Sequence, residues 1–296
     1  MRIGPAVLGY FNQTGREEQQ AEQLGGTVQT TVGPPEMRIK IVPILGQMFG
    51  GNYGFLIWDE TDPDRKAIAV DPADPYPMLR AAKADRLRIV TVLTTHWHFD
   101  HAGGNRTLAR EIPGLEVVFG AGERGQPPAI TRRLRDLEEL TVGDLTVVGH
   151  AVPGHTHGSI VYEVFSRKAP TGAATSAFTG DAIFCGGGCG ALFECSATTL
   201  HASLQLLISR LKPSTLIYPG HEYTEMSLTN ALNRKPRTAA DAEASLMAGK
   251  KLAEVRERRQ RKLPSIPSTW AEELSYSPHL QADPGALAML CGATED

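Results

Sequence analysis

The sequence predicts an α/β domain of packed layers, followed by a smaller helical region. Between residues 38 and 223, short β-rich runs are separated by Gly, Pro and Asp turns, and helical segments lie between some of them. Strands mixed with flanking helices are typical of layered α/β domains. Beyond residue 223 the pattern changes to helix, and 296 residues with 41% hydrophobic content are enough to bury such a core.

The first 36 residues are expected to lie outside this core. The stretch "TGREEQQAEQLGG" is polar and rich in Gly, Gln and Glu, with little apolar periodicity. A segment of this composition cannot bury enough apolar surface to offset the entropy of ordering. We therefore expect a flexible N-terminal extension over 1–36 and a folded α/β domain over 37–223.

Nine apolar runs are predicted to be strands, because each is rich in β-branched residues and bounded by turn residues. They span 39–45, 54–59, 67–71, 88–95, 115–120, 145–152, 159–164, 176–181 and 215–220. The clearest helix spans 197–211, where Leu200, Leu204 and Leu207 share one stripe at helical spacing.

Two further helices, 224–232 and 238–262, are predicted in the helical region 224–296. The end of the longer one, "KKLAEVRERRQRK", is basic, but Glu254 and Glu257 interrupt it at helical spacing. We interpret this run as a solvated helix face rather than a nucleic-acid surface.

The overall charge argues against two classes of partner. A formal net charge of -3 gives no positive field for a nucleic-acid backbone or an anionic membrane. No run approaches the roughly 20 apolar residues that a spanning helix needs. We therefore expect no nucleic-acid or membrane partner, and we expect the chain to act as a monomer.

The four cysteines are too few and too clustered for a disulfide scaffold in a chain of this length. We expect a reducing compartment, the cytoplasm; a mitochondrial location is the alternative, although the glutamates within 17–22 are unusual for a transit peptide. Cys185, Cys189 and Cys195 match no zinc or thioredoxin spacing, so we interpret them as small buried loop residues.

The stretch "HWHFDH", residues 96 to 101, offers four metal-binding side chains in six positions at the end of a predicted strand. Alternation along the strand places His96 and His98 on one side, and the following turn can direct Asp100 and His101 to a second point nearby. Imidazole and carboxylate together suit Zn²⁺, Fe²⁺ or Mn²⁺. One metal ion would leave some of these donors unused.

Further donors stand at the ends of three later strands, each beside a glycine. They are His155 in "VPGHTHGS", Asp181 in "FTGDAIF" and His221 in "YPGHEYT". Taken singly, each is explained equally well as a packing histidine or a capping aspartate. Five histidines and two aspartates together fit two metal ions that share one carboxylate.

These motifs resemble those of the metallo-β-lactamase superfamily. Within that superfamily they resemble those of glyoxalase II, the hydroxyacylglutathione hydrolases. "THWHFDH", "GHT", "GD" and "GHEYT" carry the first resemblance, while "GCGALFE", "PGHEYT" and "PSTWAEELSYSPHL" carry the second. The resemblance implies an αββα sandwich with a smaller C-terminal helical domain, 224–296, that binds substrate. It also implies hydrolysis of S-D-lactoyl thiol conjugates to D-lactate and free thiol, a step of methylglyoxal detoxification. Persulfide dioxygenases, with one iron, and lactonases share much of the metal pattern and are the alternatives.

The same resemblance assigns roles to individual positions. Zinc is the expected metal, with iron or manganese as alternatives. One ion would be held by His96, His98 and His155, and the other by Asp100, His101 and His221, with Asp181 bridging both; the two aspartates are the expected catalytic carboxylates. The thiol part of the substrate would contact Gly190, Ala191, Phe193, Tyr223 and Cys291. Asp71, which also ends a strand, either orients a ligand histidine or caps its turn.

Two departures bear on the identity of the thiol. Glutathione-using members carry a cation where this chain has Ala191 and an aromatic hydroxyl where it has Phe193, and residues 263–296 contain no Lys or Arg. Cations pair with the carboxylates of glutathione, so the chain is more similar to enzymes that use trypanothione, a spermidine conjugate of glutathione. In the alternative, glutathione binds through the basic helix at 250–262.

Overall fold

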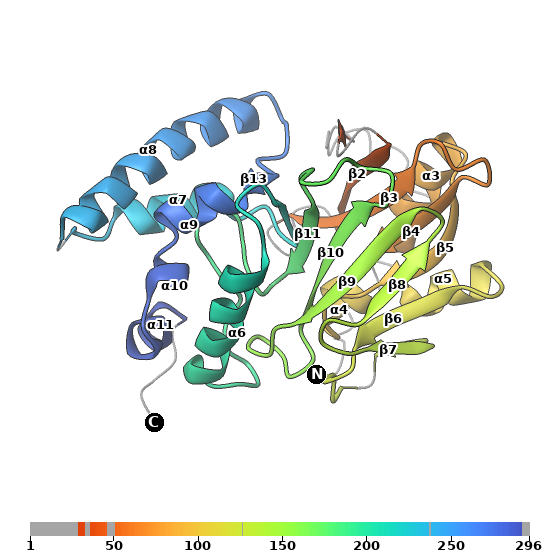
Figure 1. Cartoon of the computed structure of the whole chain (residues 1–296), viewed down its shortest axis with the longest axis horizontal. Helices are drawn as coiled ribbons and strands as arrows, with labels where there is room; N and C mark the ends of the chain where they lie inside the picture. Colours follow the sequence, from red (N-terminus) through yellow and green to blue (C-terminus); the bar gives the residue numbers. More distant parts are fainter. Residues whose placement is uncertain (1–28, 33–35, 46–50, 126, 237, 292–296) are drawn as a thin grey trace.

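Two β-sheets pack face to face, and helices cover their outer faces (Figure 1). The computed structural model describes residues 29–32, 36–45, 51–125, 127–236 and 238–291. The αββα sandwich and the C-terminal helical region expected from the sequence are both confirmed.

The first sheet has seven strands in chain order, antiparallel from β1 to β4 and parallel from β4 to β7. The strands are β1 (Gln29–Val32), β2 (Met37–Ile44), β3 (Asn52–Asp59), β4 (Lys66–Val70), β5 (Arg88–Leu93), β6 (Glu116–Gly120) and β7 (Arg132–Leu134). Strand β1 lies inside the segment 1–36 that was expected to be flexible, and it pairs with β2. Residues 1–28 and 33–35 of that segment lie outside the described residues.

The second sheet has six strands in the order β13-β12-β11-β10-β9-β8. These are β8 (Glu139–Val142), β9 (Leu145–Ala151), β10 (Ile160–Ser166), β11 (Ser176–Gly180), β12 (Leu216–Pro219) and β13 (Ser268–Thr269). Strands β11 and β12 are parallel, so their carboxyl ends lie at the same edge. Strand β13 comes from the predicted helical region, so that region contributes directly to the sandwich.

Helices of the sandwich cover both outer faces. They are α3 (Pro75–Ala84), α4 (Phe99–Ala102), α5 (Asn105–Glu111) and α6 (Ala197–Arg210). Helix α6 begins at Ser196, whose hydroxyl accepts from the Thr199 N–H, and it buries the predicted stripe Leu200, Leu204 and Leu207 in the core.

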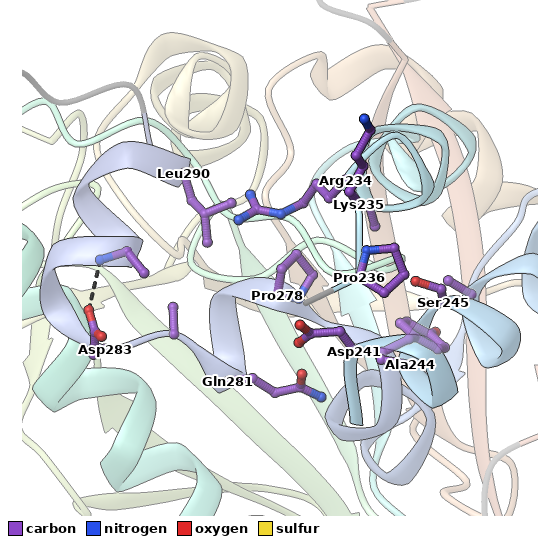
Figure 2. A pocket seen from close by; sticks show the side chains of 15 residues that line it. Arg234, Lys235, Pro236, Asp241, Ala244, Ser245, Pro278, Gln281, Asp283 and Leu290 are labelled. Atoms are coloured by element: carbon purple, nitrogen blue, oxygen red, sulfur yellow. Dashed lines mark hydrogen bonds between the residues drawn. The ribbon is translucent and has the colours of Figure 1, made fainter. Parts of the chain in front are cut away.

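The helical region lies beside the second sheet and extends away from it (Figure 1). Its helices are α7 (Thr224–Leu232), α8 (Ala239–Gln260), α9 (Trp270–Tyr276), α10 (Pro278–Gln281) and α11 (Pro284–Leu290). Residues of α8, α10 and α11 surround a pocket of about 430 Å³ (Figure 2). No helix in the described ranges is both long enough and apolar enough to cross a bilayer.

Aromatic side chains fill the space between the sheets below the edge where β11 and β12 end. Phe178 on β11 packs edge-on against Phe55, with ring centroids 5.1 Å apart, and stacks on Tyr218 of β12 at the same distance. All three are buried. This packing fixes the two strands whose ends carry Asp181 and His221.

The Phe178→Ala variant is therefore expected to lower the free energy of unfolding by about 3–5 kcal/mol, because it leaves a cavity between the sheets. Urea denaturation followed by circular dichroism measures this loss. Leu206→Ala, at a side chain of α6 that is 45% exposed, is the control and should change stability by about 0.5 kcal/mol or less. Equal losses in the two variants would contradict the placement of Phe178 in the core.

Candidate metal centre and its pocket

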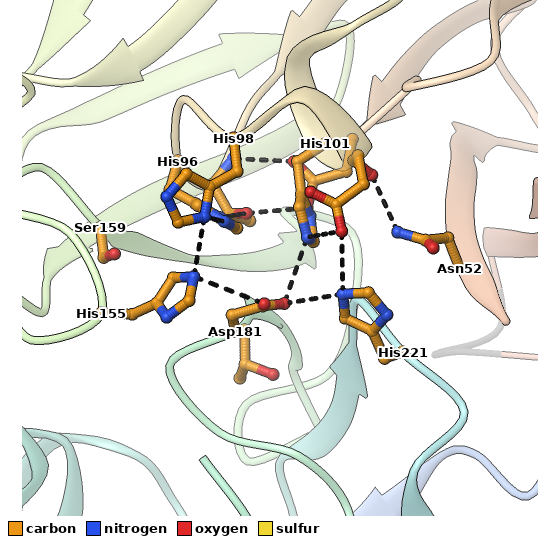
Figure 3. Close-up of polar contacts among 12 residues, drawn as sticks. Asn52, His96, His98, His101, His155, Ser159, Asp181 and His221 are labelled. Carbon is orange, nitrogen blue, oxygen red and sulfur yellow. Dashed lines mark hydrogen bonds and ion pairs between the residues drawn. The ribbon is translucent and has the colours of Figure 1, made fainter. Parts of the chain in front are cut away.

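The predicted metal-binding residues come together at one edge of the sandwich, where strands of both sheets end. Residues 96–101 follow β5 and include α4, and His155 follows β9. Asp181 comes directly after β11, and His221 follows β12. Four segments that are far apart in the sequence thus deliver their side chains to one place (Figure 3).

Backbone hydrogen bonds join the two sheets at this edge. The Ile160 N–H donates to the Thr95 carbonyl at 3.0 Å, and the Tyr53 N–H donates to the Gly220 carbonyl at 2.9 Å. Gly180 has a φ of +50°, and a Cβ on it would collide with the Thr95 hydroxyl. Glycine is therefore needed before Asp181 for the strands to approach so closely.

His96, His98 and His155 form the first cluster. Nδ1 of His98 lies 3.1 Å from Nε2 of His96 and 2.9 Å from Nε2 of His155. The three nitrogens can therefore face a common point, as the ligands of one cation do.

Asp100, His101 and His221 form the second cluster. Oδ2 of Asp100 lies 3.5 Å from Nε2 of His221 and 3.9 Å from Nε2 of His101. The three candidate ligand atoms all lie within 4.8 Å of one another.

Asp181 lies between the two clusters and directs one carboxylate oxygen at each. Its Oδ1 is 3.2 Å from Nε2 of His101 and 3.3 Å from Nε2 of His221, while its Oδ2 is 3.5 Å from Nε2 of His155. This is the arrangement that a carboxylate shared by two cations requires (Figure 3).

The chemistry of the donor set fits divalent cations. Nε2 of His101 and Oδ1 of Asp181 are buried, and neither makes a hydrogen bond of good geometry within the described parts of the chain. Buried polar atoms are nearly always paired in folded proteins. A cation facing both atoms would satisfy them.

The first cluster is held in the protonation state that a metal needs. Burial lowers the pKa of His96 well below its usual range, and it lowers the pKa of His98 to about 4 and that of His155 below normal. The neutral imidazoles keep a lone pair for a cation.

His101 shows the opposite shift. Burial acts to lower its pKa, but the nearby carboxylates of Asp181 and Asp71 outweigh burial and raise that pKa well above its usual range. The surroundings of this ring therefore favour a positive charge.

Asp71 orients His101, as one of the two interpretations of the sequence expected; the hydrogen bonds of its carboxylate within the described residues go to His101 and Thr95 and not to its own turn. Its Oδ2 accepts from Nδ1 of His101 at 2.9 Å, and its two oxygens accept from the backbone N–H and hydroxyl of Thr95 at 2.8 Å each. Because Nδ1 of His101 is engaged, Nε2 is the atom that faces the centre.

Two other histidines are oriented in the same way. Nδ1 of His155 donates to the Ala191 carbonyl at 2.7 Å, and Nδ1 of His96 lies 3.1 Å from the Thr95 hydroxyl. Ser159, by contrast, bonds to Thr156 and to no histidine within the described parts of the chain, so no serine triad forms there.

A pocket of about 1530 Å³ opens over both clusters, and four of the five expected substrate contacts line it: Gly190, Ala191, Phe193 and Tyr223. The Tyr223 ring stacks on His221 with centroids 4.7 Å apart, and the Phe193 ring, 67% exposed, lies edge-on to His98. Both rings therefore stand between the candidate metal centre and the open pocket.

The backbone at Gly190 and Ala191 already has partners within the site. The Gly190 N–H donates to the Asp181 carbonyl at 2.7 Å, and the Ala191 carbonyl accepts from His155. A Cβ on Gly190 would lie 2.5 Å from Nδ1 of His155. These groups position the centre, which the sequence did not indicate.

Cys291, the fifth expected contact, faces Cys189 rather than lining the pocket; Met289 and Leu290 before it do line it. The pocket also contains Arg106 and Arg234, which the motifs did not single out. None of the basic residues at 250–262 lines it, so the alternative glutathione site on that helix has no support from the geometry.

Two glutamates, Glu222 partly buried and Glu273 fully buried, tie the helical region to the site, and sequence reasoning missed both. Glu222 accepts hydrogen bonds from the Tyr53 hydroxyl and from the Ser265 N–H. Glu273 accepts from the N–H groups of Gly186 and Gly187, at the start of the loop that continues to Gly190. Their only signal was their position within "PGHEYT" and "PSTWAEELSYSPHL".

The fold and the site together define a class of protein. The family model of the metallo-beta-lactamase superfamily matches residues 55–221, more than half of the chain, so the chain belongs to this superfamily. Within it, the chain belongs to the hydroxyacylglutathione hydrolases, a family of thioester hydrolases.

Sequence and structure comparisons support these two statements. The chain is 36% identical to "Hydroxyacylglutathione hydrolase cytoplasmic" of Arabidopsis thaliana, over 83% of this chain and 89% of that protein. It is also 36% identical to "Hydroxyacylglutathione hydrolase-like protein" of Gallus gallus, over 88% and 85%. The crystal structure of ETHE1 from Myxococcus xanthus superposes with a TM-score of 0.59 at 23% identity, covering 85% of this chain and 89% of that one, which is evidence for the fold alone.

Asp71→Asn is expected to weaken metal binding by about 10- to 100-fold, because the carboxamide cannot accept from both Thr95 and His101 as the carboxylate does. Competition with a chelator, followed by metal analysis, measures this. Asp59→Asn is the matched control, since Asp59 is equally buried and bonds to Thr61 away from the site. Unchanged metal affinity in a folded Asp71→Asn protein would contradict the role given to Asp71.

Proposed function

We propose that this chain is a dinuclear-metal thioester hydrolase that cleaves S-D-lactoyl and related 2-hydroxyacyl thiol conjugates to D-lactate and free thiol. Such a reaction belongs to methylglyoxal detoxification. The observation that carries the proposal is the Asp181 carboxylate between two clusters of donors, at the base of an open pocket. The names of the curated relatives support the same reaction.

In this proposal, each cluster holds one divalent cation and Asp181 bridges them. The first ion has His96, His98 and His155 as ligands, and the second has Asp100, His101 and His221. Zinc is the proposed metal; iron and manganese accept the same ligands.

When bound, the two cations supply a water whose pKa is brought near neutrality and a positive charge for the developing oxyanion. The residues of the chain do the rest. Asp100 and Asp181 both line the pocket, with 21% and 11% of their side chains exposed. Either carboxylate can therefore reach the attacking water and orient it. The leaving group is a thiolate with an ordinary pKa of about 8.5, which needs no strong acid.

The helical region, 224–296, is proposed to bind the thiol part. Arg234, Met289 and Leu290 come from this region and line the pocket together with Phe193 of the catalytic domain. The proposed boundary at residue 223 places Tyr223, on the wall of the pocket, at the junction.

Trypanothione is the proposed thiol, in preference to glutathione. In trypanothione the glycine carboxylate of glutathione is joined to a polyamine, while the carboxylate of the glutamyl end stays free. Arg106 and Arg234 can pair with that shared carboxylate. Position 191 and residues 263–296 offer no cation for the free glycine carboxylate of glutathione. This lack weakens the binding of glutathione but not that of trypanothione, in which the same carboxylate is joined to the polyamine.

A cytoplasmic location and a monomeric state complete the proposal. One curated relative is named as cytoplasmic. The cysteine content of the chain also suits a reducing compartment.

Removal of the metal is expected to abolish thioesterase activity, and Zn²⁺, Fe²⁺ or Mn²⁺ should restore it. Asp181→Asn should lower kcat/KM by about 100-fold or more, because both clusters lose a charged ligand. Release of free thiol from S-D-lactoylglutathione and S-D-lactoyltrypanothione by metal-analysed protein measures these effects.

Ser159→Ala is the control for a metal-independent mechanism and is expected to keep activity. Loss of activity in Ser159→Ala, together with insensitivity to chelation, would contradict the proposed mechanism. Oxygen consumption with glutathione persulfide, without thiol release from either thioester, would instead favour the persulfide dioxygenase alternative.

Lactoyltrypanothione is expected to have a kcat/KM about tenfold above that of lactoylglutathione. Ala191→Lys should narrow this difference, because it supplies the cation that a free glycine carboxylate needs. Ala191→Gln is the matched control, with a side chain of similar length and no charge. A tenfold preference of the unmodified chain for glutathione would overturn the choice of thiol and leave the proposed reaction intact.

A further inference from the structure

Cys189 and Cys291 lie side by side, although 102 positions separate them in the sequence. Their sulfur atoms are 3.3 Å apart, and a ring nitrogen of His279 lies within 4.8 Å of both. Cys189 belongs to the loop after β11, and Cys291 directly follows α11. The interpretation of the clustered cysteines as small buried loop residues holds for Cys185 but not for Cys189 and Cys195, which are partly exposed; Cys189 also lines the pocket.

The two thiols are chemically unequal. The hydrogen bond between the two sulfurs and the nearby His279 lower the pKa of Cys291 to about 5, against the opposing effect of burial. The pKa of Cys189 is raised well above its usual range by the same hydrogen bond and by burial. Cys291 is therefore the nucleophilic thiolate of the pair, and Cys189 is the thiol that can resolve an oxidised Cys291.

The loop that carries Cys189 also positions the candidate metal centre. Gly190, the next residue, donates to the Asp181 carbonyl, and Ala191 accepts the hydrogen bond that orients His155. A movement of Cys189 is thus transmitted through two residues to both clusters.

Helix α11 has space on two sides. Leu290 lines both the pocket over the metal centre and the smaller pocket of about 430 Å³ next to α8 (Figure 2). Leu287 is the helix's one buried side chain. Beyond Leu287 the side chains of this helix are partly buried or exposed, so its end has room to shift.

We propose that Cys189 and Cys291 are a redox modification site, at which a hydroperoxide converts the two thiols into a disulfide that fastens α11 to the loop of the metal centre. Formation of the bond draws the sulfurs about 1 Å closer together, to a length of about 2.05 Å. The loop and the helix share this movement, and hydrolysis slows because His155 and Asp181 are displaced. In a reducing compartment such a disulfide is transient and regulatory.

The reaction balances with hydrogen peroxide as the oxidant. The Cys291 thiolate attacks one peroxide oxygen, the O–O bond breaks, and hydroxide leaves and takes up a proton to become water. The sulfur of Cys189 then attacks the sulfenic acid on Cys291, and the S–O bond breaks as a second water departs with the Cys189 proton. Two thiols lose two electrons, and the peroxide gains them.

A metal site made of the same three residues is a weaker explanation. Closed structural zinc sites have four ligands. The cluster of Cys189, His279 and Cys291 offers three, and no fourth donor belongs to it within the described ranges.

Mapping the cross-link by mass tests the proposal on the metal-loaded protein. After peroxide treatment and alkylation, trypsin releases residues 169–210, with Cys185, Cys189 and Cys195, and residues 263–296, with Cys291 alone. We expect these two peptides to be joined, and to separate with dithiothreitol. The joined species should be absent from Cys189→Ser and Cys291→Ser and present in Cys195→Ser, the control from the same peptide.

Activity provides the second measurement, and it rests on the proposed thioesterase function. Peroxide should lower kcat/KM by about tenfold, since a displacement of about 1 Å at a positioned site is costly, and dithiothreitol should restore it. Each variant is compared with its own reduced form, and only the Cys195→Ser variant should respond as the unmodified chain does.

Three outcomes would overturn the proposal: a joined peptide that persists in Cys189→Ser, oxidation of Cys291 to sulfinic acid without a cross-link, or a cross-link that leaves kcat/KM unchanged. A third zinc ion that is lost in Cys291→Ser and blocks the cross-link would favour the metal site instead. If neither thioester is hydrolysed, the proposed function fails, while the joined peptide still identifies the redox site.

Discussion

The buried carboxylate of Asp181 is the constraint on which the rest of this structure depends. Its two oxygens face imidazole nitrogens of both clusters, at distances of 3.2 to 3.5 Å, in a place from which water is largely excluded. Lone pairs that face one another in a low dielectric repel, and leaving them without positive charge is expensive. The protein therefore has to hold this group together by other means, and cations have to complete it.

The strand ends, and the hydrogen bonds around them, keep the side chains of both clusters in place around Asp181. Parallel pairing of β11 and β12 sets Asp181 and His221 at one edge, and hydrogen bonds between the sheets bring the end of β5 to the same edge. Asp71 and the Ala191 carbonyl then fix which nitrogen of each histidine faces inward. Because the donors stand on short segments close to the strand ends and several are fixed by hydrogen bonds, little ordering is left for the cations to impose.

Local patterns in the sequence predicted those parts of the fold and of the site that local interactions determine. Long apolar runs and the leucine stripe of α6 predicted the central strands and helices, and the four motifs predicted seven residues that do converge. Short strands such as β7 and β13 have too few residues to show alternation. Contacts between distant segments, such as Glu273 with Gly186 or Cys189 with Cys291, left no periodic signal at all.

These contacts give the sandwich and the helical region different parts in building the site. The sandwich supplies all seven side chains of the candidate dinuclear centre, whereas the helical region supplies Glu273, which holds the start of the 186–191 loop, and Arg234 on the pocket wall. A change in the helical region can therefore alter the pocket without replacing any ligand. Since the same loop ends at the carbonyl that orients His155, the wall of the pocket and the geometry of the candidate metal centre are connected through the backbone of residues 186–191.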